Sequence, residues 1–411
     1  MRIYHAQATV LSPALYNLSP ASFFPTNSHH PLTYQSSMAS TISSFASLSF
    51  LLLLQTMPTH SMAQPESGEE QSAMVPAMFV FGDSLIDNGN NNNLPTLAKA
   101  NYYPYGIDFA GGPTGRFFNG YTIADELAEL LGLPLTPPFS QVSGIFNNGR
   151  HGINYASAAA GILDNSGRNF VSLIPFNQQI MNFASTMQQY TTILGEERAS
   201  DAIARSVFFI GFGSNDYLNN YLMPNYNTRF QYNGEQFAEL LIEQYGRQLQ
   251  DLYNLGARRF MVANVGVLGC IPSVLAQNFI NHCSADINNL VLIFNGKLRT
   301  LLHNLDSNLP GSKFVHIDIN GMFNDILENP ESYGFSVVNR GCCGIGRNRG
   351  QITCLPLQTP CPNRNKYVFW DAFHPTSAVN IILARRAFSG NTEVVSPLNI
   401  QQLATLNLEN N

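Results

Sequence analysis

The fold of this chain can be worked out from Ala77-Met78-Phe79-Val80-Phe81-Gly82, a stretch that is apolar throughout. Four further short runs have the same near-continuous apolar character, and they span residues 152–157, 206–211, 259–264 and 313–318. Strands that are covered on both faces of a parallel sheet have such runs, whereas half-exposed strands alternate apolar and polar residues. The five runs therefore predict a mainly parallel five-stranded sheet that is buried on both sides.

Helical patterns lie between the later runs. Asn233, with Gln236 three residues later, has the pattern of a helix N-cap, and apolar residues recur at helical spacing from there to Gly256. A second helical pattern carries apolar residues from Ile287 to Leu305. Strands that alternate with helices indicate an α/β fold with right-handed crossovers, and in such folds the chemistry gathers at the carboxyl ends of the strands.

The composition is that of a folded domain. Of 411 residues, 45% are hydrophobic and 12% are charged, which excludes a disordered chain. The net charge is −6 and no block of consecutive Lys or Arg occurs, so nucleic acid is excluded as a partner, because phosphate binding needs clustered cations. No internal repeat or long linker divides residues 64–411, and this part is predicted to form a single domain.

The N-terminal part differs from the rest in composition. Residues 1–63 contain one charged residue, Arg2, and an apolar run at residues 45–54. The run is too short to cross a bilayer, which needs about 20 residues, but it fits the apolar region of a secretory signal. Ser61-Met62-Ala63 supplies small residues for cleavage. We expect an N-terminal extension followed by a signal peptide, with Met38 as a possible true start; the alternative is an ordinary buried helix.

All six cysteines lie after this segment, and they are Cys270, Cys283, Cys342, Cys343, Cys354 and Cys361. An even number of cysteines in an exported chain predicts disulfides, and six cysteines allow fifteen pairings. The alternative is a zinc site formed by the last four. Adjacent cysteines lack the usual spacing of zinc ligands, so disulfides are favoured. We expect no metal, no cofactor and no membrane-spanning segment in residues 64–411.

Candidate functional side chains follow three of the apolar runs. Ser84 comes directly after the first run and a turn at Gly82, which places it at the carboxyl edge of the sheet. Asn215 follows the run at 206–211, where its side-chain amide could donate to an oxyanion. Small residues at 156–161 would let a ligand approach the backbone closely. Taken singly, a Ser or an Asn in a turn more often forms the turn or caps a helix.

Asp371 and His374 lie near the end of the chain, in the segment Trp370-Asp371-Ala372-Phe373-His374-Pro375-Thr376. An acid three residues before a His can hydrogen-bond its Nδ1, which fixes the tautomer and stabilises the imidazolium. Pro375 is predicted to begin a helix over residues 376–388. A lone His beside a carboxylate is more often structural than catalytic, but none of the other eight His residues has such a partner in the sequence.

Together these segments resemble a known family. Four segments, in order, are similar to the four signature blocks of the GDSL esterase/lipase family within the SGNH hydrolases, and they span residues 81–91, 152–157, 213–217 and 371–376. The Asn-rich end of the first block and the Cys342-Cys343-Gly344 segment resemble the large plant branch of that family. The resemblance extends from about residue 76 to about residue 390.

The resemblance implies a three-layer α/β/α sandwich of flavodoxin-like type and the hydrolysis of carboxylic esters. It makes Ser84 the nucleophile and His374 the general base toward Ser84 and then the general acid toward the leaving alcohol. Asp371 would orient His374. The implied substrate is a small-molecule, lipid or cell-wall ester, and the implied location is extracellular, in the apoplast or cell wall. The oligomeric state is left open.

The resemblance also implies an oxyanion hole made of the Ser84 N–H, the Asn215 side chain and a backbone N–H from the second block. Ala158 stands where relatives usually have Gly, and the first Gly of this segment is Gly161. We place the third donor at Ala158, with Gly161 as the alternative. If the position needs a positive φ, alanine costs about 1 kcal/mol or more there.

Two other functions use the same residues. An acyltransferase would pass the acyl group to an alcohol rather than to water, with an identical set of side chains. A secreted binding protein with a vestigial site would bind esters without cleaving them. The complete set of Ser84, Asn215, Asp371 and His374 argues against the binding protein, and Ala158 is the feature in its favour.

Overall fold

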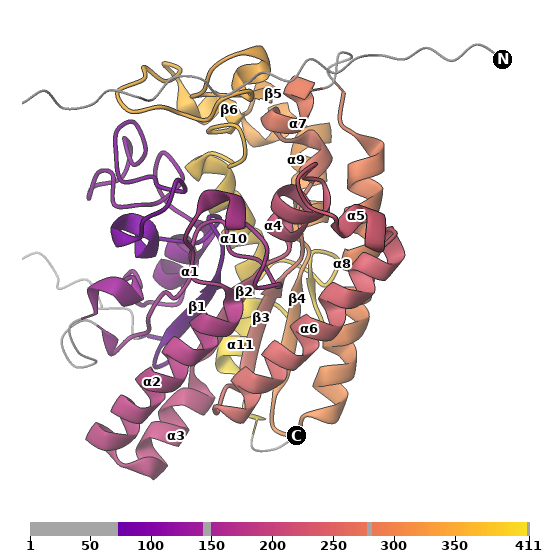
Figure 1. Ribbon diagram of the computed structural model, residues 1–411. Helices are drawn as coiled ribbons and strands as arrows, with labels where there is room; N and C mark the ends of the chain where they lie inside the picture. The colour runs from indigo at the N-terminus through magenta and orange to yellow at the C-terminus, as the bar shows by residue number, and fades with distance from the viewer. Residues whose placement is uncertain (1–72, 143–148, 278–281, 409–411) are drawn as a thin grey trace, which may run out of the picture. The chain divides into compact units, whose positions relative to one another are not determined.

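The computed structural model describes residues 73–142, 149–277 and 282–408. The predicted extension and signal peptide, with Met38, lie outside the described residues. The central sheet has the strand order β1-β2-β3-β4-β7, and the labels β1 to β4 mark its parallel strands in Figure 1. Its strands are β1 (Met78–Gly82), β2 (Val207–Gly211), β3 (Arg259–Ala263), β4 (Lys313–Ile317) and β7 (Val395–Ser396), of which β7 alone is antiparallel to its neighbour. The prediction of a mainly parallel five-stranded sheet is confirmed.

Residues 152–157 do not form one of these strands, so this part of the prediction is wrong. Four backbone hydrogen bonds join residues 151–157 to β1, but only one bridge of a parallel ladder forms, at Val80. The ladder stops at one end because Gly152 has a φ of 115°. It stops at the other end because the N–H of Gly82 donates to a side chain instead. The fifth strand is β7, at the opposite edge of the sheet.

Helices cover both faces of the sheet. Successive residues of each strand point to opposite sides, so each face of the sheet presents apolar side chains to the helices on that side. Two separate hydrophobic clusters result, one containing Phe79 and Phe81 and the other containing Met78 and Val80. The first cluster includes α2 (Phe176–Leu194), α3 (Glu196–Arg205), α6 (Gly234–Asn254) and α8 (Ala285–Asn308), and the second includes α1 (Ile123–Leu130), α9 (Ile319–Glu328), α10 (Ser377–Ser389) and α11 (Ile400–Thr405). The fold is the predicted three-layer α/β/α sandwich.

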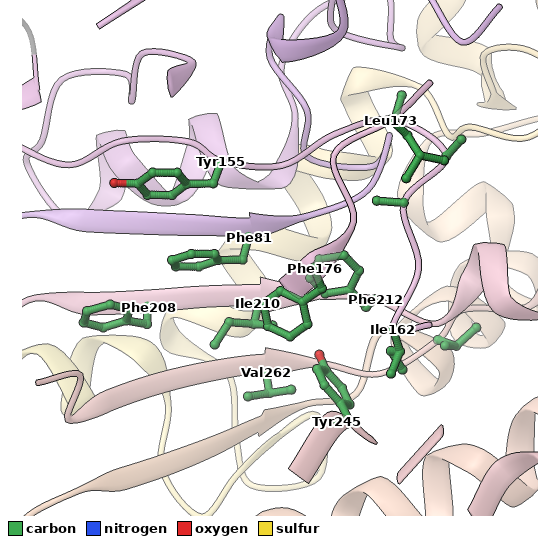
Figure 2. Close-up of a cluster of buried hydrophobic side chains, with 14 of the residues drawn as sticks. Phe81, Tyr155, Ile162, Leu173, Phe176, Phe208, Ile210, Phe212, Tyr245 and Val262 are labelled. Atoms are coloured by element: carbon green, nitrogen blue, oxygen red, sulfur yellow. The ribbon is translucent and has the colours of Figure 1, made fainter. Parts of the chain in front are cut away.

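The first cluster consists largely of aromatic rings. Figure 2 shows Phe81 of β1, Phe208 and Ile210 of β2 and Val262 of β3 beside Phe176 of α2 and Tyr245 of α6. The rings of Phe81 and Tyr155 stack with their centroids 5.0 Å apart, and those of Phe176 and Phe212 stack at 4.3 Å. Because these rings lie directly beneath the carboxyl ends of β1 and β2, they provide a rigid base for the loops that follow.

The predicted helices form close to their expected bounds. In α6 the side chain of Asn233 accepts from the N–H of Gln236, whose side chain accepts from the Asn233 N–H in return, and Gly256 follows the helix with a φ of 103°. Thr376 is the N-cap of α10, so this helix begins at Ser377, two residues after Pro375. Shorter elements are α4 (Ser214–Asp216), α5 (Thr228–Gln231), α7 (Pro272–Gln277), β5 (Val337–Gly341) and β6 (Tyr367–Phe369).

All six cysteines form disulfides, as predicted, and the pairs are Cys270–Cys283, Cys342–Cys361 and Cys343–Cys354. The four cysteines of the alternative zinc site are therefore bonded to one another. The N–H of Cys343 donates to Trp370 O at 2.7 Å, so this disulfide is attached to the chain just before Asp371. No helix within the described ranges is long and apolar enough to cross a membrane.

Candidate active site

Ser84 lies at the carboxyl end of β1, as predicted. Gly82 is needed in the turn before it, because a Cβ there would lie 2.3 Å from the Ile86 side chain and 2.8 Å from Gly211 O. The carbonyl of Asp83 accepts from the Ile86 N–H at 3.2 Å, which closes the turn. Ser84 remains partly exposed and lines a cavity.

The structure brings Ser84, His374 and Asp371 together. His374 Nε2 lies 2.8 Å from Ser84 Oγ, and its Nδ1 lies 2.9 and 3.0 Å from the two oxygens of Asp371. When Nδ1 carries the proton and donates it to Asp371, Nε2 is free to accept from the Ser84 hydroxyl. Burial opposes ionisation of Asp371, but the neighbouring imidazole and the hydrogen bonds to the carboxylate lower its pKa below the ordinary value of 3.8.

A tight turn between β6 and α10 holds His374 in place. The N–H of Trp370 donates to His374 O at 2.8 Å, and the N–H groups of Phe373 and His374 donate to Asp371 Oδ1 at 2.9 and 2.8 Å. The N–H of Thr376 then donates to Val368 O at 2.8 Å. The backbone of the turn therefore fixes both members of the Asp–His pair.

Asp371 has two further donors that the sequence did not indicate. The hydroxyl of Tyr105 donates to Oδ2 at 2.6 Å, and the hydroxyl of Thr353 donates to the same oxygen at 3.2 Å. Tyr105 lies 266 residues before Asp371 in the chain and Thr353 lies 18 residues before it, and neither segment has a pattern that predicts contact with a carboxylate.

Asn215 lies beside Ser84, at the start of α4. An oxyanion donor, the role that we predicted for Asn215, has to lie close to Ser84. Its Nδ2 donates to Asp83 Oδ2 at 3.2 Å and to Ala160 O at 2.9 Å, and its Oδ1 accepts from Asn219 Nδ2 at 2.6 Å. These bonds fix the orientation of the amide. Both N–H groups of the amide have an acceptor here, so donation to an oxyanion requires that one of these bonds be exchanged.

The predicted third donor at Ala158 needs correction. Its N–H donates to Asp87 Oδ2 at 3.0 Å, so it is engaged, and Ala158 is not among the residues with a positive φ. Ala159 is the residue with a left-handed backbone, at a φ of 69°. Within the described residues its N–H has no acceptor, and Ala159 lines the cavity together with Ser84. No sequence pattern indicates this backbone, because alanine rarely adopts a positive φ.

Gly161, the alternative donor, is packed away from the cavity. A Cβ at this position would lie 2.6 Å from Ser166 Cβ and 2.7 Å from both oxygens of Asp216. The residue is needed for the close approach of these neighbours, which explains a Gly there without a role in binding.

Three buried carboxylates lie beneath the site. Asp83 accepts from the Asn215 side chain. Asp87 accepts from the backbone N–H groups of Gly89, Asn90 and Ala158. Asp216 accepts from the N–H groups of Ile162 and Leu163 and from the Ser166 hydroxyl. Burial raises the pKa of Asp83 to about 7 and those of Asp87 and Asp216 to about 6. The carboxylates thus connect the loops after β1, the 152–157 segment and β2.

A cavity of about 140 Å³ opens beside Ser84 and His374. Its wall is mainly apolar and includes Leu85, Tyr102, Phe117, Phe170, Leu218 and Phe373. Lys99 also lines it, with Nζ donating to Asn92 O at 3.0 Å. Within the described residues no group of three or more His, Cys, Asp or Glu side chains is arranged to hold a metal ion.

Comparisons with known proteins show what this chain is similar to. A family model described as GDSL-like Lipase/Acylhydrolase matches residues 78–387. A GDSL esterase/lipase of Arabidopsis thaliana is 60% identical over 335 residues, which are 81% of this chain and 87% of the relative. A second from the same plant is 50% identical over 360 residues, covering 87% and 96%. Among solved structures, a gut microbial diltiazem-metabolizing enzyme is 12% identical, with a TM-score of 0.34, over 76% of this chain and 46% of that one.

The matched model spans most of the chain, and the two plant relatives align along more than four fifths of it. The resemblance seen in the sequence is thereby confirmed. The chain belongs to the GDSL-like lipase/acylhydrolase family and is a carboxylic ester hydrolase.

Proposed function

We propose that the protein is a secreted serine esterase that works through an acyl-enzyme on Ser84. The observation that carries this proposal is the 2.8 Å contact between His374 Nε2 and Ser84 Oγ, with Nδ1 of the same ring held by Asp371. Ser84 Oγ attacks the ester carbonyl carbon as its proton passes to Nε2. The C–O bond to the alcohol then breaks, and the alcohol leaves with that proton. Water repeats the sequence and releases the acid.

The negative charge that develops on the carbonyl oxygen needs donors beside Ser84. We assign the N–H groups of Ser84 and Ala159, which have no acceptor within the described residues, and Nδ2 of Asn215. The Asn215 bond to Asp83 is the longer of its two, so this is the one that the oxyanion replaces. Each such donor is worth about 10²–10³ in kcat.

The apolar wall beside the nucleophile supports an ester with a hydrophobic acyl or alcohol part, from a small molecule, a lipid or a cell-wall polymer. Water and an alcohol would use the same residues as acyl acceptors. Product analysis with a competing alcohol therefore measures how the acyl group is divided between hydrolysis and transfer.

Ser84→Ala is expected to abolish hydrolysis of a short p-nitrophenyl ester while the fold is retained, because no nucleophile remains. Activity and circular dichroism of wild type and variant are compared, with Ser185→Ala on the exposed side of α2 as the control. Labelling by a fluorophosphonate should occur in the wild type and be absent from Ser84→Ala. Full residual activity would rule out the assignment, and an unlabelled wild type would favour a binding protein.

Export is supported by the three disulfides, which form in oxidising compartments. The signal-like pattern that ends at Ala63 predicts that the secreted protein begins at Gln64. N-terminal sequencing of protein recovered from the medium or the cell wall checks this. An uncleaved chain that stays inside the cell would contradict it.

A further inference from the structure

The carboxylate of Asp371 has two oxygens with different partners. Oδ1 accepts from two backbone N–H groups of its own turn, whereas Oδ2 accepts from the hydroxyls of Tyr105 at 2.6 Å and Thr353 at 3.2 Å. The two hydroxyls are also 3.2 Å from each other. His374 Nδ1 lies about equally far from both oxygens, so the donors on Oδ2 share the carboxylate with the imidazole.

Tyr105 is held rigidly in this position. Its side chain is 1% exposed, and its ring meets those of Trp370, Phe117 and Tyr102 edge to face, at centroid distances of 6.2, 6.0 and 5.3 Å. Phe117 in turn contacts the His374 ring at 5.2 Å. The hydroxyl of Tyr105 therefore cannot leave Oδ2 without movement of the surrounding rings.

Thr353 is tied to the same place by covalent chemistry. It directly precedes Cys354, whose disulfide partner Cys343 donates its N–H to Trp370 O at 2.7 Å. Trp370 is the residue before Asp371. The disulfide thus fixes the threonine relative to the carboxylate that it contacts.

The titratable groups that face the Asp–His pair are Tyr105 and Tyr102 near Asp371 and Asp83 near His374. Burial, together with the charge of Asp371, raises the pKa of Tyr105 well above its ordinary value. The tyrosine therefore remains a neutral donor over the whole working range, and it never supplies a competing charge.

We propose that Tyr105 is a positioning residue for ester hydrolysis, acting through Asp371 with support from Thr353. The inference rests on the proposed function of Ser84 and His374. When His374 takes the proton of Ser84, the carboxylate must face the imidazolium with both oxygens. A donor on Oδ2 prevents the carboxylate from rotating and spreads its charge. Tyr105 is thus a fourth side chain in line with Ser84, His374 and Asp371, and it does not touch the substrate's reacting atoms.

Tyr105→Phe removes this donor and keeps the ring. We expect kcat per active site to fall about ten-fold, with KM within about two-fold, because a hydrogen bond to a charged group is lost. Without the donor Asp371 becomes more basic and attracts the imidazolium more strongly. The acid limb of kcat/KM should therefore move up by about half to one pH unit. The concentration of active sites is measured by labelling with a fluorophosphonate, so a misfolded fraction does not affect the calculated kcat.

The matched control is Tyr155→Phe. This tyrosine is equally buried, but its hydroxyl donates to Thr186 Oγ1 at 2.7 Å in the core rather than to a carboxylate. We expect a loss of stability with the acid limb unchanged. A Tyr105→Phe enzyme with the kcat and acid limb of the wild type would overturn the inference while leaving ester hydrolysis by Ser84 intact. Activity retained by Ser84→Ala would instead remove the proposed function and this inference with it.

Thr353→Val and Thr353→Ser provide a second pair at a partly exposed position. The valine variant should shift the acid limb in the same direction by a smaller amount, and the serine variant should restore it, since serine keeps the hydroxyl. If Tyr105→Phe does not fold, the two Thr353 variants test the inference in its place. Equal pH profiles of the valine and serine variants would contradict the inference.

Discussion

Ala158 and Ala159 have the same side chain, but their backbones give them different roles at the cavity. The N–H of Ala158 donates to Asp87, whereas Ala159 has a φ of 69° and an N–H without an acceptor in the described part of the chain. A left-handed backbone costs an alanine about 1–2 kcal/mol, and such strain is typical of functional sites. The sequence made strain at Ala158 conditional on a positive φ, and the residue with that backbone is its neighbour Ala159.

Substitution of each of these two alanines by glycine distinguishes the energy of backbone strain from the energy of side-chain packing. Ala158→Gly should lower the free energy of unfolding by about 1–1.5 kcal/mol, because a buried methyl group is lost and the unfolded chain gains freedom. Ala159→Gly has the same losses, but release of the strain offsets them, so its stability should stay within about 0.5 kcal/mol of the wild type. Urea denaturation measures both. Equal destabilisation by the two substitutions would contradict the argument.

The site residues that the sequence predicted are those whose chemistry is visible in their type. Ser84, Asp371, His374 and Asn215 carry a hydroxyl, a carboxyl, an imidazole and an amide at expected strand ends or in the C-terminal loop, and the structure places them together. Tyr105 could not be found in this way. Its contact with Asp371 depends on tertiary packing of rings, which no local pattern records.

At the scale of elements, strands β1 to β4 were predictable because continuous apolar runs of this length are buried on both faces of a sheet. Helix α6 was predictable from its N-cap and its apolar spacing, α8 from its apolar spacing, and α10 from Pro375 just before it. Strand β7 was not, because it has only two residues and no periodicity. The 152–157 segment has a strand-like composition, but Gly152 and the side-chain partner of Gly82 end its ladder, and sequence periodicity reports neither.

The side-chain partner of Gly82 is Gln179 of α2. It is fully buried, its Oε1 accepts from the Gly82 N–H at 3.0 Å, and its Nε2 donates to Gly82 O at 2.9 Å. Gln179→Ala should lower the free energy of unfolding by about 2–3 kcal/mol, because a buried N–H loses its acceptor. It should also lower kcat, since Ser84 follows two residues later. Denaturation and ester hydrolysis measure these effects.

Gln178→Ala on the same helix is the control. This side chain is exposed and its Nε2 donates to Asn182 Oδ1 at 3.0 Å on the helix surface, so its loss should cost less than about 0.5 kcal/mol. Equal effects of the two substitutions would mean that the Gly82 contact contributes nothing specific.

At the scale of the whole molecule, folding buries more carboxylates than the proposed chemistry uses. Asp83, Asp87 and Asp216 have pKa values of about 7, 6 and 6, raised by burial from the ordinary 3.8. At a pH above 3.8 but below these raised values, the three carboxyl groups are protonated in the folded chain and ionised in the unfolded chain. The free energy of unfolding contributed by these groups is therefore largest at low pH and falls as the pH rises toward about 7.

The expected outcome is a greater free energy of unfolding at about pH 5 than at about pH 8, measured by urea denaturation. His316 opposes this trend, because burial lowers its pKa to about 4 and only the unfolded chain is protonated below the ordinary 6.5. Three carboxyl groups outweigh one imidazole. Asp371, with its pKa lowered below 3.8, changes the free energy of unfolding only in more acidic solution than this. A free energy that rises steadily from about pH 5 to about pH 8 would refute the account.

The segment that failed to become a strand has one more effect. By hydrogen-bonding along β1, residues 151–157 occupy backbone groups that would otherwise be open to a strand from another molecule. At the opposite margin, β7 is too short to template such pairing. Both margins of the sheet are thus protected against intermolecular β-aggregation.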